Sequence, residues 1–185
     1  MEQDKVFNII SSPSELSQKE EILSRSLNDL IYFGRAFLPN DFLNKSQSPP
    51  FHYDVAEKLI TTKPGARICN IMPRGFGKSI LAKAAILHKI CFSPTDERNF
   101  IAWVAEEQGQ AIDHLKYLRN HLESNKSIQY YFGQLAGDLA GKRWTEKDLV
   151  TSKGDRIIAK GTTQRLRGRT EIDVRYTGII LDDFE

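Results

Sequence analysis

The side chains best suited to phosphate chemistry lie in one short stretch of the chain, at Arg74, Gly75, Gly77, Lys78 and Ser79. Glycines allow backbone N–H groups to approach oxyanions closely, and the N-terminus of a helix adds a favourable dipole. In that arrangement Lys78 reaches the β- and γ-phosphates of a nucleotide, and the Ser79 hydroxyl helps to hold Mg²⁺. Met72 occupies the first glycine position of the strict pattern G-x-x-x-x-G-K-[ST], so a chance Gly-Lys-Ser at a helix start stays as the alternative.

Carboxylates near the last strand-like run form a second candidate group. Residues 178–181 are apolar, and Asp182, Asp183 and Glu185 follow them. Ligands of open α/β sheets bind at the carboxyl ends of the strands. We expect Asp182 to hold Mg²⁺ through its water shell, and either Asp183 or Glu185 to polarise the water that attacks the γ-phosphate. A solvated acidic turn is the alternative.

The elements that position these groups follow from hydrophobic periodicity. It predicts helices over residues 20–38, 53–60, 80–91 and 108–123, with the first stopped by Pro39 and a loop over 40–50. It predicts strands over residues 67–72, 99–104, 147–152, 156–160 and 176–181. The alternation indicates an α/β fold with a mostly parallel sheet, buried on both faces and decorated by a hairpin at residues 147–160. We expect a helical lead-in over residues 1–50 and a phosphate-binding domain over 51–185.

Composition limits the class of protein. The chain has 185 residues, and 26 Lys+Arg against 24 Asp+Glu give a net charge of +2. Ten Phe, six Tyr and two Trp exclude disorder of the whole chain. No apolar run approaches the ~18 residues that a membrane span needs, and the polar start of the chain is unlike a signal peptide. Cys69 and Cys91 lie in apolar stretches, which argues against a disulfide framework.

Basic residues gather between residues 141 and 175, where ten stand against five acidic ones. Such a segment is suited to line a DNA channel through phosphate contacts, or to supply an arginine to the γ-phosphate of a neighbouring subunit. A solvated loop is the alternative. The ten are Lys142, Arg143, Lys147, Lys153, Arg156, Lys160, Arg165, Arg167, Arg169 and Arg175.

The remaining aromatic and histidine residues are expected to be structural. Trp103 lies in an apolar strand-like run and is expected in the core, and Trp144 is expected to pack the hairpin onto the sheet. The histidines at 88, 114 and 121 have no Cys or His at metal-ligand spacing, so we predict no zinc site.

In this order the motifs resemble the ATPase domain of the large terminase subunit of tailed bacteriophages, the DNA-packaging motor. Residues 73–79 resemble that family's deviant phosphate loop, in which an arginine stands four residues before the lysine, as Arg74 does here. Residues 144–168 resemble its middle section, where a hairpin around a glycine precedes an Arg-Gly element. Phe51 and His52 stand where the family commonly has an aromatic residue and a glutamine that contact adenine. The resemblance covers roughly residues 51–185.

The resemblance implies a P-loop NTPase of the RecA-like, additional-strand type with a β-hairpin insertion, truncated after the Walker B strand. It implies Mg²⁺-dependent hydrolysis of ATP that drives double-stranded DNA into a procapsid, with ATP and Mg²⁺ as cofactors. Lys78 would act on the phosphates, and Arg167 is favoured as the arginine finger ahead of Arg165 and Arg169. The implied partners are double-stranded DNA, the small terminase subunit and the portal protein, with a homo-oligomeric ring on the portal, in the host cytoplasm and away from membranes.

The chain also departs from the family pattern. His52 replaces the usual glutamine, and Asp183 stands where the family often has the catalytic glutamate, which leaves Glu185 as a rival base. In the family, a further strand lies between the Walker A and Walker B strands, and a nuclease domain follows. Residues 1–185 include neither, so we expect exposed apolar edges, poor ATP hydrolysis and no nuclease activity from these residues alone. A superfamily 2 helicase-like ATPase and a nucleotide-binding module without turnover are the two rival hypotheses.

Overall fold

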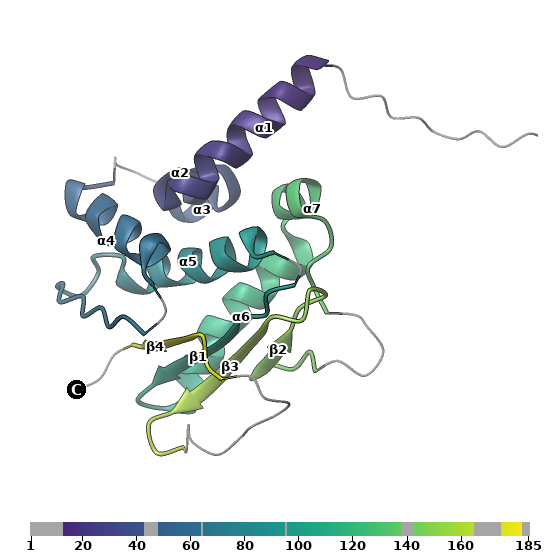
Figure 1. Ribbon diagram of the computed structural model, residues 1–185. Helices are drawn as coiled ribbons and strands as arrows, with labels where there is room; N and C mark the ends of the chain where they lie inside the picture. Colours follow the sequence, from purple (N-terminus) through teal and green to yellow (C-terminus); the bar gives the residue numbers. More distant parts are fainter. Residues whose placement is uncertain are drawn as a thin grey trace, which may run out of the picture.

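The computed structural model shows a four-stranded sheet with helices packed on it (Figure 1). The strands are β1 Phe100–Ala105, β2 Asp148–Val150, β3 Arg156–Gly161 and β4 Gly178–Leu181, in the spatial order β2-β3-β1-β4. β1 pairs in parallel with β3 and with β4, and β2 pairs antiparallel with β3. The predicted mixed α/β fold with a mostly parallel sheet is confirmed. The structure describes residues 13–42, 48–63, 65–94, 96–137, 143–164 and 175–182.

The predicted hairpin is part of the sheet rather than a decoration on it. β3 lies between β2 and β1, with Arg156 opposite Phe100. Its turn is as predicted, because Gly154 has a φ of +93°, a backbone conformation that favours glycine. The hairpin signal reports only the pairing of β2 with β3. It says nothing of the other edge of β3, which is free to pair with β1.

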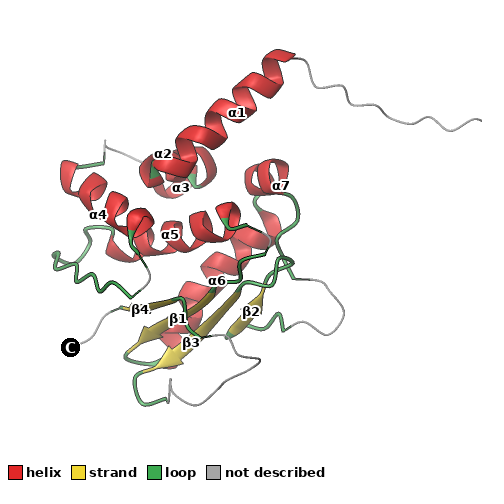
Figure 2. Ribbon diagram, viewed as in Figure 1, coloured by secondary structure: helices red, strands yellow, loops and turns green. Residues whose placement is uncertain are grey.

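Helices account for most of the remaining described residues (Figure 2). They are α1 Pro13–Asn28, α2 Leu30–Phe37, α3 Pro39–Phe42, α4 Pro50–Thr61, α5 Lys78–Phe92, α6 Gln108–Ser124 and α7 Lys126–Phe132. The helices predicted over 53–60, 80–91 and 108–123 are confirmed as α4, α5 and α6. No helix in the described part of the chain is long and apolar enough to cross a membrane.

Capping residues mark two helix starts that were not predicted. The helix predicted over 20–38 is two helices, because Asp29 is extended and its side chain accepts a hydrogen bond from the Tyr32 N–H, which caps α2. α2 ends before Pro39 as predicted, but Pro39 then begins α3, so residues 40–42 are helical and not part of a loop. α7 was not predicted. Asn125 separates it from α6, and its side chain accepts from the Ile128 N–H.

The main core lies between the helices and one face of the sheet. Alternate residues of β1 point to opposite faces, and Ile101, Trp103 and Ala105 are buried in one cluster with residues of α2, α5 and α6. The opposite face carries a smaller cluster that includes Phe100 and Ala102. The expected burial of Trp103 is confirmed, since none of its surface is exposed.

The predicted burial of the sheet on both faces is wrong at β4. Ile180 stands opposite Trp103 and packs against the main core. Ile179 and Leu181 point to the other face and are 48% and 63% exposed. Among the described strands β4 is the last in the sheet and pairs with β1 alone, so one edge and one face of it lack a cover.

Candidate functional site

The glycine-rich loop ends where α5 begins. Gly75 and Gly77 have φ angles of +84° and +75°, in the left-handed region that favours glycine. Gly77 caps α5, and its carbonyl accepts the N–H of Leu81 at 3.0 Å. Because the first N–H groups of a helix have no partner within it, this end of α5 offers hydrogen-bond donors and a positive dipole. Lys78 and Ser79 lie half-buried in that first turn.

The side chain of Lys78 folds back over the loop that precedes it. Its Nζ donates to the carbonyl of Met72 at 2.6 Å and to that of Pro73 at 3.4 Å. Arg74 is exposed on the same turn. The ammonium group of Lys78 is therefore held against the backbone of the loop, and an anion bound there would take the place of these carbonyl acceptors.

Two residues in the first turn of α4 contact the loop. His52 Nε2 donates to the Phe76 carbonyl at 2.9 Å, which assigns the Nε2-protonated tautomer because a carbonyl only accepts. The rings of Phe51 and Phe76 lie with their centroids 5.7 Å apart. The structure thus brings together the residues predicted to contact adenine and the loop predicted to bind phosphate.

The strand predicted over residues 67–72 is not formed. These residues run as loop between α4 and α5, drawn in green in Figure 2. Ile71 is 92% exposed. A strand needs a partner for its backbone N–H and C=O groups. The apolar run at residues 67–72 indicates a tendency to form a strand. In the described part of the chain, however, the sheet ends at β4, and β4 does not pair with this run.

Asp182 lies at the carboxyl end of β4, as predicted. Its backbone N–H donates to the Val104 carbonyl at 3.0 Å, which continues the pairing with β1. Its side chain is only 11% exposed, and Oδ2 lies 3.4 Å from His114 Nε2, within ion-pair distance. That oxygen accepts no hydrogen bond from the described residues. The predicted metal ligand is therefore a buried carboxylate whose negative charge is only partly balanced by neighbouring groups.

A polar cluster beside this end of β4 was not predicted. Burial lowers the pKa of Lys83, and the charges of Asp41 and Asp182 oppose that shift. Lys83 Nζ lies 4.2 Å from the centroid of the Tyr117 ring, and the Tyr117 hydroxyl donates to Asp41 at 2.5 Å. Burial and that hydrogen bond raise the pKa of Tyr117. The cluster joins α3, α5 and α6, and no local spacing in the sequence signals residues so far apart.

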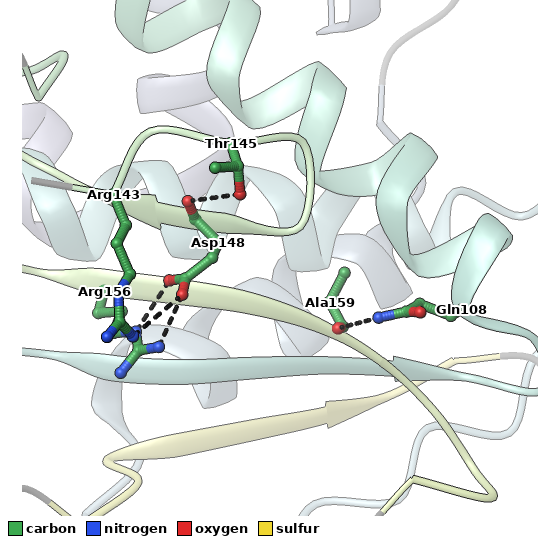
Figure 3. A network of polar contacts seen from close by, with 6 residues as sticks. All are labelled: Gln108, Arg143, Thr145, Asp148, Arg156 and Ala159. Carbon is green, nitrogen blue, oxygen red and sulfur yellow. Dashed lines mark hydrogen bonds and ion pairs between the residues drawn. The ribbon is translucent and has the colours of Figure 1, made fainter. Parts of the chain in front are cut away.

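Two arginines of the basic segment form ion pairs with Asp148 of the hairpin (Figure 3). Arg156 donates through Nε and Nη2 to the two carboxylate oxygens of Asp148, at 2.8 and 2.7 Å. Arg143 Nη1 lies 3.6 Å from the same carboxylate. A two-point contact of this kind fixes geometry. It joins β2 to β3, which gives Arg156 a structural contact within the hairpin.

Lys153 of the same segment is also used internally. Its Nζ donates to the carbonyls of Ile90, Cys91 and Ser93 at 3.2, 2.9 and 3.3 Å. These carbonyls lie at the C-terminus of α5, where a cation is favoured. Lys147 and Arg175 are exposed. In the described part of the basic segment, some side chains therefore have structural contacts and others are exposed.

Several predicted site residues lie outside the described residues. They are the candidate bases Asp183 and Glu185, and the candidate finger Arg167 with its rivals Arg165 and Arg169. Their roles stay predictions from the sequence.

The other aromatic and histidine residues have structural contacts. Trp144 packs against the main core and pairs with Leu149, so the expected packing of the hairpin is confirmed. His88 Nε2 donates to the carbonyls of Ser26 and Leu27 at 3.0 and 3.1 Å, which joins α5 to the end of α1. Burial lowers the pKa of His88, and these two carbonyls oppose the shift.

Comparison with known proteins identifies no relative of this chain. No family model matches it, and neither a curated protein nor a solved structure does. The mixed α/β fold with a four-stranded, mostly parallel sheet is established by the strand pairing itself.

Proposed function

We propose that this chain binds ATP at residues 73–79 and hydrolyses it with Mg²⁺, as the ATPase part of a DNA-packaging motor. The observation that carries the proposal is the contact of Phe51 and His52 with Phe76. It places an aromatic ring and an imidazole against the loop that opens α5. A chance Gly-Lys-Ser at a helix start does not require such an arrangement.

Three kinds of group support phosphate binding at this loop. The backbone N–H groups at the start of α5 are donors with the helix dipole behind them. The ammonium of Lys78, now on the carbonyls of Met72 and Pro73, would gain a stronger charge-assisted bond to a phosphate oxygen. Arg74, exposed on the turn, adds a second positive charge.

The residues at the carboxyl end of β4 fit a divalent cation. The Asp182 carboxylate is buried and its Oδ2 accepts no hydrogen bond from the described residues. A buried charge is costly unless it is paired, and carboxylate oxygens are ligands that Mg²⁺ prefers. Asp182 and Ser79 would hold the ion, which neutralises charge that develops on the phosphate oxygens.

The finer proposal, a DNA-packaging motor, is supported by the resemblance of the motifs. The hairpin of β2 and β3 turns at Gly154, and the resemblance also implies a hairpin around a glycine, although β3 is here a central strand of the sheet and not part of an insertion. A helicase-like ATPase would share the loop and the acid at the end of β4 but leaves the hairpin unexplained.

Nucleotide binding without turnover is the second candidate. The observation that favours it is the loop conformation of residues 67–72, directly before the glycines. In that conformation the segment is not fixed by strand pairing, so the packing of α5, and not a strand, joins the phosphate loop to the sheet that holds Asp182. Catalysis demands a closer match of positions than binding does.

Steady-state ATP hydrolysis separates these candidates. We expect residues 1–185 to hydrolyse ATP slowly, with a rate that requires Mg²⁺ and rises with double-stranded DNA, and we expect Asp182→Asn to lower that rate at least about tenfold. Binding of ATP without hydrolysis would favour the second candidate. Stimulation by single-stranded DNA alone would favour the helicase-like ATPase, and the absence of any nucleotide binding would overturn all three.

A further inference from the structure

Two side chains near the end of β4 have been given no role in binding or catalysis so far. His114 lies on α6 and Trp103 on β1. His114 Nε2 lies 3.4 Å from Asp182 Oδ2, and the His114 ring stacks on the indole of Trp103, with 4.4 Å between centroids and 25° between planes. The three side chains form a row that runs from the core to the carboxyl end of β4.

Trp103 gives His114 a rigid platform. The indole is fully buried, and its residue stands opposite Ile180, two positions before Asp182 on the neighbouring strand. Stacked aromatic rings are attracted beyond the area that they bury. The plane of the imidazole is therefore set by the core, although a quarter of the His114 side chain is exposed.

Asp182 needs such a support because its own strand is the last in the described sheet. A carboxylate offers about four acceptor positions, so one N–H donor leaves the others for the water shell of a cation. Carboxylates that bind metals are themselves hydrogen-bonded, and these outer partners orient them. The 3.4 Å between His114 Nε2 and Asp182 Oδ2 is slightly longer than a usual hydrogen bond, and the imidazole is the neighbour within ion-pair distance of this carboxylate oxygen among the described residues.

We propose that His114 is a positioning residue for Asp182. Through its Nε2–H it holds the carboxylate in the orientation that binds the Mg²⁺ of the nucleotide, with Trp103 fixing the ring. The inference rests on the proposed nucleotide site and adds to it a residue that the phosphate-loop pattern does not contain.

The test measures how much Mg²⁺ strengthens the binding of a non-hydrolysable ATP analogue to the full chain. The Kd is determined in Mg²⁺ and in EDTA, and the ratio isolates the contribution of the metal, because the loop contacts act in both conditions. The variants are Asp182→Asn, His114→Gln and His114→Asn. A glutamine amide reaches about as far as Nε2 and keeps an N–H donor, whereas asparagine is one methylene shorter. Circular dichroism and the Tm check that both variants at position 114 fold alike.

We expect Asp182→Asn to abolish the strengthening by Mg²⁺, His114→Asn to reduce it about tenfold, and His114→Gln to preserve it. The Kd in EDTA should be unchanged in all of them. Loss in Asp182→Asn with a wild-type ratio in His114→Asn would overturn this inference alone, and so would equal loss in both variants at position 114. A wild-type ratio in Asp182→Asn would overturn the metal site, and a wild type that binds no analogue would overturn the proposed function itself.

Discussion

Replacing Gly77 by alanine tests whether the loop needs its left-handed backbone. Gly77 caps α5 with a φ of +75° and a ψ of 13°. A β-carbon added there would lie 3.4 Å from the His52 ring, an ordinary van der Waals contact. The cost of the substitution therefore comes from backbone strain, which is about 1–2 kcal/mol for an L-residue in this region.

That strain is divided between folding and binding. If the Gly77→Ala variant keeps the observed conformation, the free energy of unfolding falls by about 1–2 kcal/mol, and the Tm of a chain of this size falls by roughly 2–8 °C. If the loop relaxes instead, nucleotide binding must return it to the strained conformation. The strain energy then lowers the affinity for the nucleotide roughly 5- to 30-fold. The two losses together should amount to about 1–2 kcal/mol.

The assay combines thermal unfolding with titration of a non-hydrolysable ATP analogue. Gly133→Ala is a control for the site, because Gly133 also has a positive φ, +77°, but follows α7. It should lower the Tm and leave the affinity unchanged. Gly109→Ala is a control for the direction of the stability change. Gly109 lies in α6 without a positive φ and with open space around it, so alanine causes no strain there. It should raise the stability by up to about 1 kcal/mol. A Gly77→Ala variant with wild-type Tm and wild-type affinity would refute the reasoning.

Three other substitutions test contacts named above. Arg156→Lys removes the two-point contact with Asp148 and should cost about 1–2 kcal/mol, seen as a lower Tm; an unchanged Tm would show that the contact does not hold β2 to β3. Burial lowers the pKa of His88 below its usual 6.5, so on acidification the unfolded chain binds the proton at a higher pH than the folded chain does. The contribution of neutral His88 to the free energy of unfolding is therefore fully present above that pH and is lost as the pH falls below it. The wild type should lose more stability than His88→Gln on acidification from about pH 7 to 5, and parallel slopes would contradict this. His52→Ala removes the bond to the Phe76 carbonyl and should weaken binding of the ATP analogue by about 1 kcal/mol, so equal titration curves would argue against the role of α4.

Local patterns predicted the elements whose determinants are local. α4, α5, α6 and β1 lie where the periodicity placed them, because each helix buries one stripe in the core and β1 is buried on both faces. The split at Asp29 was missed, since apolar residues continue with helical spacing across it and only the cap shows the break. A hydrophobic pattern predicts which residues are buried, but it says little about where a helix is capped.

Pairing between distant segments was harder to predict. Residues 67–72 carry an apolar run typical of a strand, but a strand also needs a neighbouring edge, which no local window contains. The role of β3 as a central strand and the pairing of Asp182 with His114 depend likewise on topology. The contact of His52 with the Phe76 carbonyl, which joins α4 to the loop, also links residues that no local window contains.

The affinity of the wild type and of Lys78→Met for a non-hydrolysable ATP analogue in Mg²⁺ tests the proposed ATP site most directly. Loss of a charge-assisted bond to phosphate costs roughly 1.5–3 kcal/mol, which is about 10- to 150-fold in Kd. Lys89→Met is the matched control, since Lys89 lies exposed near the other end of α5. We predict weak binding by Lys78→Met and wild-type binding by Lys89→Met. Equal binding by all three proteins, or none by the wild type, would contradict the account.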